Sequence, residues 1–242
     1  VRVAGDVVAA VGVDSKQTYV AGYKTKEFTP MHLSVMDGGL DMVEYIYYMS
    51  LNYGGMEVFL ADTTGKVNLL SGSQPQLDGL KLSENGKKAA YLDTDANTGD
   101  TILVEIELGK EKAETVATNV QSFGYIGNTL IYYFDYTEGV GTLGAAGSKT
   151  TIANASGVQF TEDAVYYVAD ADAATGNGEL RAWDGKTETA IAKDVFAFQY
   201  KENGKLVYIG KYDVNAGVGD LYYYDGKEAR KLDTGITAIF IY

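Results

Sequence analysis

The chain has 242 residues, 33 acidic and 20 basic side chains, a formal net charge of −13 and no cysteine. This negative field repels phosphate backbones and anionic lipid head groups, so the composition argues against partners of either kind. The absence of cysteine excludes disulfides, thiolate catalysis and cysteine-ligated metal centres. No apolar run reaches the roughly eighteen residues that a membrane-spanning helix needs, so no direct insertion into a membrane is expected.

Tyrosine (20 residues) and glycine (29) are abundant and proline (2) is rare, which favours many strands joined by tight turns. The first expected elements are strands over Val7–Val13 and Gln17–Gly22, joined across Asp14–Lys16. The chain begins with Val rather than Met, so we expect a processed or trimmed product with a signal or anchor segment upstream.

From residue 31 onward, a unit of about forty residues recurs, with apolar strands, polar turns and a tyrosine-bearing second strand. Aligned on this strand, five tyrosines fall into one column at spacings of 34 to 43 residues: Tyr48, Tyr91, Tyr133, Tyr167 and Tyr208. Later turns give a similar period through glycines spaced by 38 to 44 residues: Gly65, Gly109, Gly147, Gly185 and Gly226. Asn-Gly pairs at 85–86 and 203–204 predict hairpin turns before two of the tyrosine strands, because both residue types tolerate positive φ.

Four short strands per unit predict an all-β fold of the β-propeller type, built from four-stranded blades. Residues Ile236–Tyr242 match the first strand of a further unit, and the N-terminal unit is too short for a full blade. We therefore expect a ring of six blades, with five to seven as the range, closed by pairing of the N- and C-terminal strands. The single domain 1–242 divides into units 1–30, 31–77, 78–119, 120–156, 157–194 and 195–235, followed by a closing strand 236–242.

The phrase Leu82–Tyr91 resembles the core of the WD40-like repeats of TolB-type bacterial propellers, and Lys201–Tyr208 is a looser copy. The phrase Tyr222–Lys227 resembles propeller-like domains of extracytoplasmic bacterial proteins of unknown role. The resemblance covers most of residues 31–242 and implies the fold and an extracytoplasmic, secreted or cell-surface location. It implies no particular activity, because propellers host enzymes, ligand binders and scaffolds alike.

The loop after Tyr91 approximates a calcium-binding pattern, with alternating oxygen-bearing residues at Asp93, Asp95, Asn97 and Asp100. We predict calcium at these four residues and no other cofactor. The alternative is a solvated hairpin loop in which Asp and Asn bind their own backbone. The loop lacks the bidentate glutamate of an EF-hand at the expected place.

Catalytic motifs are missing. His32 is the only histidine, and beside Met31 and Leu33 it fits a packed strand edge better than a catalytic dyad. The chain has no G-x-S-x-G elbow, no phosphate-binding glycine loop and no sialidase-type box. No catalytic residue is predicted.

Adjacent tyrosines at 47–48, 132–133, 166–167 and 222–223 place one ring on each face of a strand. One ring of each pair is expected in the core between blades, and the others can form an aromatic mouth for sugars or peptides. The function expected is a non-catalytic binding or scaffold propeller for a protein or carbohydrate partner. One alternative is a glycan-active hydrolase with paired carboxylates in the central depression; another is a sensory or structural domain of a longer anchored protein.

Overall fold

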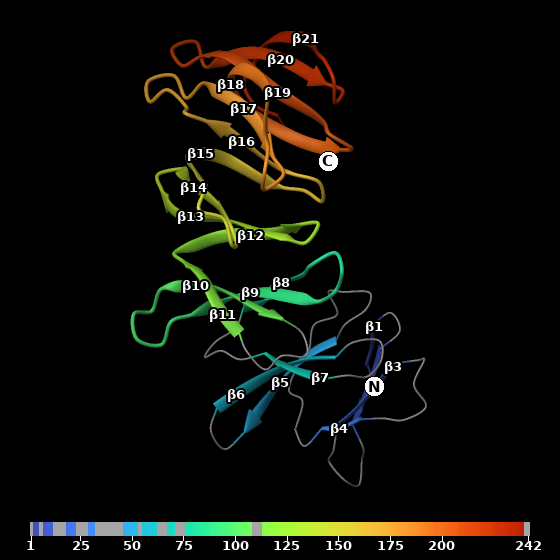
Figure 1. Ribbon diagram of the computed structural model, residues 1–242. Helices are drawn as coiled ribbons and strands as arrows, with labels where there is room; N and C mark the ends of the chain where they lie inside the picture. Colours follow the sequence, from blue (N-terminus) through green and yellow to red (C-terminus); the bar gives the residue numbers. More distant parts are fainter. Residues whose placement is uncertain are drawn as a thin grey trace. The chain divides into compact units, whose positions relative to one another are not determined.

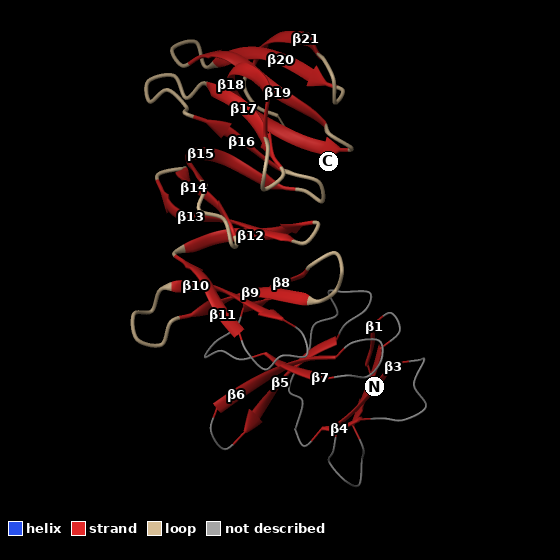
Figure 2. Cartoon of the chain, in the orientation of Figure 1, coloured by secondary structure: helices blue, strands red, loops and turns tan. Residues whose placement is uncertain are grey.

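The computed structural model describes residues 76–107 and 113–239, together with strand segments 2–4, 7–11, 18–22, 29–31, 46–52, 55–61 and 67–70. Side chains are described for residues 80–107 and 113–239. All regular elements in these ranges are β-strands (Figure 2), and no helix among them is long and apolar enough to cross a bilayer. Two compact units, Val1–Thr118 and Asn119–Tyr242, are described in turn.

The first unit begins with a four-stranded antiparallel sheet of order β1-β2-β3-β4. Its strands are β1 (Arg2–Ala4), β2 (Val7–Val11), β3 (Thr18–Gly22) and β4 (Thr29–Met31). The pairing of β2 with β3 confirms the strand pair expected at this end of the chain. A three-stranded sheet follows, made of β5 (Ile46–Asn52), β6 (Gly55–Ala61) and β7 (Val67–Leu70).

A second four-stranded sheet of this unit contains β8 (Gln76–Leu82), β9 (Lys88–Thr94), β10 (Thr101–Glu107) and β11 (Ala113–Thr118). The β8–β9 connection is the predicted Asn-Gly turn, with Gly86 at a φ of 64°. The buried hydroxyl of Ser83 accepts a hydrogen bond from the Lys88 N–H at 3.0 Å and so closes this turn. Tyr91, on the strand that follows, is completely buried.

The second unit is a single antiparallel meander of ten strands in sequential order, from β12 to β21 (Figure 1). Its strands are β12 (Val120–Ile126), β13 (Thr129–Thr137), β14 (Val140–Ala145), β15 (Thr151–Phe160), β16 (Val165–Ala169), β17 (Gly178–Trp183), β18 (Glu188–Glu202), β19 (Lys205–Asp213), β20 (Val218–Tyr224) and β21 (Ala229–Ile236). We call residues 120–156, 157–194 and 195–235 repeats I, II and III.

The prediction of separate four-stranded blades closed into a ring is wrong for the described residues. Strand β15 pairs with β14 through its first half and with β16 through its second half, and β18 joins β17 to β19 in the same way. The outer strand of one repeat therefore continues as the first strand of the next. No described sheet contains strands from both ends of the chain, and residues 237–239 are described outside any strand.

The physical reason for this continuity lies at the corner residues of the long strands. Asn154 and Asp194 adopt φ of 56°, which turns the chain within β15 and β18 while antiparallel pairing resumes on the far side. Asn119 has a φ of 54° just before β12. Asn and Asp tolerate this left-handed conformation better than other non-glycine residues. A turn-forming residue at these corners therefore bends a strand without ending it.

One residue with positive φ marks the register of the second strand of each repeat. These residues are Asp135 and Lys211, where the pairing with the third strand shifts, and Asp170, which directly follows β16. A glycine of the third strand packs against the backbone just before each of them: Gly141, Gly178 and Gly219. By this count Tyr132 is the counterpart of Tyr167 and Tyr208, since each lies three residues before its positive-φ residue. The predicted column is therefore wrong by one residue at Tyr133.

Two clusters of the described residues form the hydrophobic core between neighbouring repeats, one between each pair. The first brings together Tyr133 and Leu143 of repeat I with Tyr167 and Trp183 of repeat II. The second contains Tyr166 of repeat II and Tyr208 of repeat III. Tyr166 and Tyr167 thus point to opposite faces of β16, which confirms the expected alternation of adjacent tyrosines.

Candidate functional site

The candidate site is a hollow of about 390 Å³ between the edges of repeats I and II. It lies where β13 begins, where β14 ends and where β17 ends, so turns from two repeats face each other. The lining comprises Thr129, Ala145, Ala146, Gly147, Ser148, Thr150, Trp183, Gly185 and Lys186. Its volume is at the small end of the range typical of small-molecule sites.

The wall from repeat I is the turn that follows β14. The Ala146 N–H donates to the Leu130 carbonyl at 2.8 Å, and the Ser148 N–H donates to the Ala145 carbonyl at 3.0 Å. The hydroxyl of Ser148 accepts from the Thr150 N–H at 3.0 Å. Gly147 has a φ of 76°, a conformation that glycine adopts without the steric cost of a Cβ. These bonds hold the small side chains of the turn at the rim of the hollow.

The opposite wall is the Trp-Asp-Gly-Lys turn that follows β17. The carboxylate of Asp184 accepts from the N–H groups of Lys186 and Thr187 at 2.8 and 2.7 Å. These hydrogen bonds, with that to Thr187 the larger cause, lower the pKa of Asp184. Gly185, at a φ of 91°, lies so close to repeat I that an added Cβ would be 3.0 Å from Cγ2 of Thr129. Asp184 and Gly185 together therefore place Lys186 at the rim.

Trp183 lines the hollow and belongs to the core between the two repeats. Only 2% of its surface is exposed, and it packs in the cluster that contains Tyr167 and Leu143. It is the only tryptophan of the chain. The indole is therefore a core side chain, and nearly all of the exposed lining comes from the other residues.

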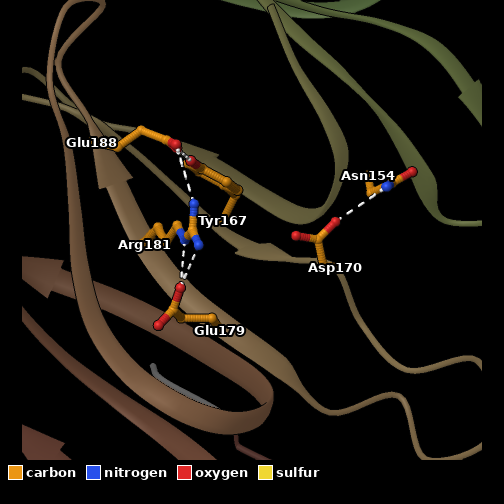
Figure 3. A network of polar contacts seen from close by, with 6 residues as sticks. All are labelled: Asn154, Tyr167, Asp170, Glu179, Arg181 and Glu188. Carbon is orange, nitrogen blue, oxygen red and sulfur yellow. Dashed lines mark hydrogen bonds and ion pairs between the residues drawn. The ribbon is translucent and has the colours of Figure 1, made fainter.

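A polar network in repeat II surrounds Arg181 of β17, two residues before Trp183 (Figure 3). The guanidinium of Arg181 binds Glu179 through Nε at 2.7 Å and both carboxylate oxygens of Glu188 at 3.2 Å. The hydroxyl of the buried Tyr167 donates to Glu188 at 3.0 Å. Burial, followed by the charge of Glu188, raises the pKa of Tyr167, so this phenol stays protonated as a donor.

The charge balance of the hollow differs from that of the whole protein. Lys186 is the one charged side chain among the described residues that line it. The neighbouring acidic groups are already engaged, Asp184 by backbone N–H groups and Glu188 by Arg181 and Tyr167. An acidic chain thus presents a cation at this position.

The residues predicted to bind calcium lie in the β9–β10 connection and form a closed turn. Asp95 accepts hydrogen bonds from the N–H groups of Asn97 and Thr98 at 2.7 and 3.1 Å, which lower its pKa. Asp93 is buried, and one of its oxygens accepts from the Thr94 N–H at 2.7 Å. Asp172 and Asp213 cap the equivalent loops of repeats II and III in the same way. Calcium binding by Asp93, Asp95, Asn97 and Asp100 stays a prediction.

Among residues 80–107 and 113–239, no group of three or more His, Cys, Asp and Glu side chains gathers as a metal centre would require. His32 lies outside the described residues. The sequence indicated turns at Gly147 and Gly185 but did not bring them together. The lone tryptophan, two residues before Gly185, is a signal that could have drawn attention to the site.

One exposed aromatic contact was also missed from sequence. The rings of Phe196 and Tyr212 stack with centroids 3.8 Å apart and an interplanar angle of 9°. The side chain of Asn177 binds the backbone of Tyr212 through both its amide and its carbonyl, at 2.9 and 3.2 Å. An added Cβ on Gly176 would meet the Phe196 ring at 3.0 Å. This cluster fastens the loops of repeats II and III to each other.

No family model matches the sequence, and no curated protein matches it. Among solved structures, the β-propeller domain of the Trilobed protease from Pyrococcus furiosus has a TM-score of 0.50 and 13% identity, over 82% of this chain and 70% of that one. TolB from Acinetobacter baumannii has a TM-score of 0.41 and 12% identity, over 90% and 60% of the two chains. An acylaminoacyl peptidase has a TM-score of 0.47 and 13% identity over 81% of this chain, which spans only 39% of that enzyme.

The antiparallel repeats and the likeness to the Pyrococcus furiosus domain support a β-propeller fold for this protein. The expected resemblance to propeller proteins is confirmed at the level of fold. Identities this low carry nothing about activity, which has to be argued from the site.

Proposed function

We propose that this protein is a non-catalytic binding module of β-propeller fold whose ligand lies in the hollow between repeats I and II. The observation that carries the proposal is the composition of the hollow, which lies against the buried Trp183 and carries three hydroxyl groups and one cation. Small-ligand sites combine apolar surface with a few placed polar groups, and the lining of this hollow offers both. The partner is a carbohydrate, or a protein that offers a small group to the hollow.

The alternative of a glycan hydrolase is not supported by the residues described around this hollow. Such enzymes need two carboxylates across the scissile bond. No described lining residue is acidic, and the nearby Glu179 and Glu188 both bind Arg181. Incubation of the protein with glycans and peptides should give no product, and appearance of a cleaved product would contradict the non-catalytic part of the proposal.

An extracytoplasmic location remains part of this proposal, supported by the sequence resemblance to extracytoplasmic propellers. The net charge of −13 supports the expectation that the partner is not a nucleic acid. Cell fractionation of the producing organism tests the location directly.

The ligand site is tested by the fluorescence of Trp183, which reports on this hollow alone because the chain has no other tryptophan. Titration with a panel of glycans and short peptides should change the emission for at least one class. Thr150→Phe should abolish the change, because this exposed lining residue would fill the hollow with a ring. Thr189→Phe, at an exposed position of β18 outside the lining, is the matched control and should leave the titration intact.

A further inference from the structure

We propose that the hollow selects a saccharide bearing a carboxylate, which it binds through Lys186. This inference rests on the proposed function and adds to it the chemical class of the ligand. It starts from the contrast between a strongly acidic chain and a site whose described lining carries a single, positive charge.

The ammonium group of Lys186 is available to a ligand. It makes no hydrogen bond or ion pair with any of residues 80–107 and 113–239, whereas Lys88 pairs with Glu105 and Lys231 with Asp220, both at 2.8 Å. Its nearest acidic neighbour in sequence, Asp184, is held by backbone N–H groups. A ligand carboxylate at the rim would therefore gain a charge-assisted hydrogen bond without displacing an existing ion pair.

Besides Lys186, the lining offers three hydroxyl groups as hydrogen-bond donors and acceptors, those of Thr129, Ser148 and Thr150. Each hydroxyl can donate one hydrogen bond and accept others, as the hydroxyls of a sugar do. The oxygen of Ser148 already accepts from the Thr150 N–H, so its own proton remains to be donated. A polyhydroxylated ligand can match this set, and a purely apolar acid cannot.

The alternative of a peptide bound as an added strand conflicts with the sheet order. The three strands that contribute to the hollow, β13, β14 and β17, each have hydrogen-bonded neighbours on both sides. They offer no free edge to an extended backbone, which is how a peptide joins a sheet. The hydroxyl groups of the lining instead suit a compact, polyhydroxylated ring.

The test compares glucuronate and galacturonate with glucose and galactose, which lack the carboxylate, by calorimetry and Trp183 fluorescence of the full chain. Acetate and a short acidic peptide are titrated in the same way, as carboxylates that are not sugars. We expect both uronates to bind at least about tenfold more tightly than the neutral sugars, a difference of about 1.4 kcal/mol in binding free energy, because only the uronates offer a charged acceptor to Lys186. Lys186→Gln should remove this preference and Lys186→Arg should keep it.

Lys227→Gln is the matched control. Lys227 lies in the same kind of turn, where the Asp225 carboxylate accepts from the N–H groups of Lys227 and Glu228 at 2.9 and 3.0 Å, but it does not line the hollow. This variant should bind the uronates as the wild type does. Comparison of Lys186→Gln with Lys227→Gln distinguishes the effect of the charge at the hollow from the effect of losing one positive charge anywhere on the protein.

Equal binding of neutral and acidic sugars, unaffected by Lys186→Gln, would overturn the inference and leave the proposed function standing. Binding of acetate or the acidic peptide as strong as that of the uronates would overturn the saccharide class. No response to any probe in any arm would overturn the inference and the proposed function together.

Discussion

The side chain of Asn154 donates a hydrogen bond from Nδ2 to Oδ1 of Asp170 at 3.1 Å, while the Asp170 N–H donates to the Asn154 carbonyl at the same distance (Figure 3). Both residues have positive φ, 56° and 48°. One repeat earlier, Asn119 and Asp135 form the same pair, with distances of 3.2 and 3.1 Å. The corner within β15 is therefore fastened to the residue that directly follows β16, which lets β15 change partners without losing its pairing.

This arrangement predicts different costs for two substitutions at Asn154. Asn154→Gly loses the side-chain hydrogen bond but removes the Cβ that the positive φ disfavours, whereas Asn154→Ala loses the bond and keeps a Cβ in this conformation. We expect alanine to lower the free energy of unfolding by about 1–2 kcal/mol more than glycine does. Urea denaturation of the two variants measures this difference. Equal losses, or a larger loss for glycine, would show that the corner conformation is not under strain.

Alkaline pH should destabilise the protein through its buried tyrosines. Burial, with a smaller contribution from Tyr136, raises the pKa of Tyr133 to about 12 from 10.0, and burial also raises the pKa of Tyr132, Tyr166, Tyr167 and Tyr208. Above pH 10 the unfolded chain releases these protons while the folded chain retains them. The stabilisation is therefore complete below about pH 10 and is lost as the pH rises through 12.

Denaturation midpoints measured across this range should fall steadily, and the fall should be shallower in Tyr133→Phe, which removes one of the ionisations. At neutral pH the same variant should lose about 1 kcal/mol, because the Tyr133 hydroxyl donates to the buried Ala155 carbonyl at 2.8 Å. A constant midpoint from pH 10 to 12 would contradict the assignment of these rings to the core.

Position 185 requires glycine because of its positive φ and because of its close contact with repeat I. The equivalent turn at Gly226 has the positive φ without the close contact, so the two effects can be measured separately. Gly185 has a φ of 91°, and its Cβ would meet Thr129 and Ile131 of repeat I at 3.0 and 3.2 Å. Gly226 has a φ of 100° in the equivalent turn of repeat III, where the nearest atom to an added Cβ is 3.8 Å away. Gly226→Ala should cost about 1–3 kcal/mol from backbone strain alone.

Gly185→Ala should cost more than Gly226→Ala, and it should also weaken ligand binding because the new methyl group projects toward the wall of the hollow. Thermal denaturation and the Trp183 titration measure the two effects. Identical stability and binding in the two variants would mean that the turns of repeats I and II do not face each other closely.

Calcium binding at the β9–β10 loop, if it occurs as the sequence pattern predicts, should raise the melting temperature in a concentration-dependent way. Asp100→Asn should remove this rise, since the amide cannot supply the charge that a calcium site needs. Asp163→Asn, at an exposed turn residue far from this loop in sequence, should keep it. A calorimetric titration with calcium chloride that shows neither heat nor a thermal shift would end the prediction.

The sequence predicted the strands and turns where the chemistry is local. Asn203 and Gly204 form the expected two-residue hairpin turn, with φ of 49° and 73° and the pairing of Glu202 with Lys205 on either side. The register at Tyr132–Tyr133 could not be read, because two adjacent tyrosines fit the column equally well and the bulge at Asp135 leaves no distinct signal. The continuity of β18 was also hidden, since Asp194 resembles a turn residue although the strand continues through it.

The candidate site could be predicted only in parts, because its walls are 38 residues apart in sequence at Gly147 and Gly185. The sequence predicted each of the two turns, but their proximity depends on how repeats I and II pack through Trp183 and Tyr133. The contact between the two turns is a tertiary relationship, and no local sequence pattern encodes it.

The most direct measurement of the central claim, that a ligand occupies the hollow between repeats I and II, is protection of an introduced thiol. The chain has no cysteine, so Ser148→Cys in the lining and Thr189→Cys outside it each provide a single reactive position. Saturating galacturonate should slow alkylation of the thiol at position 148 and leave that at position 189 unchanged. Equal alkylation rates at position 148 with and without the ligand would contradict the claim.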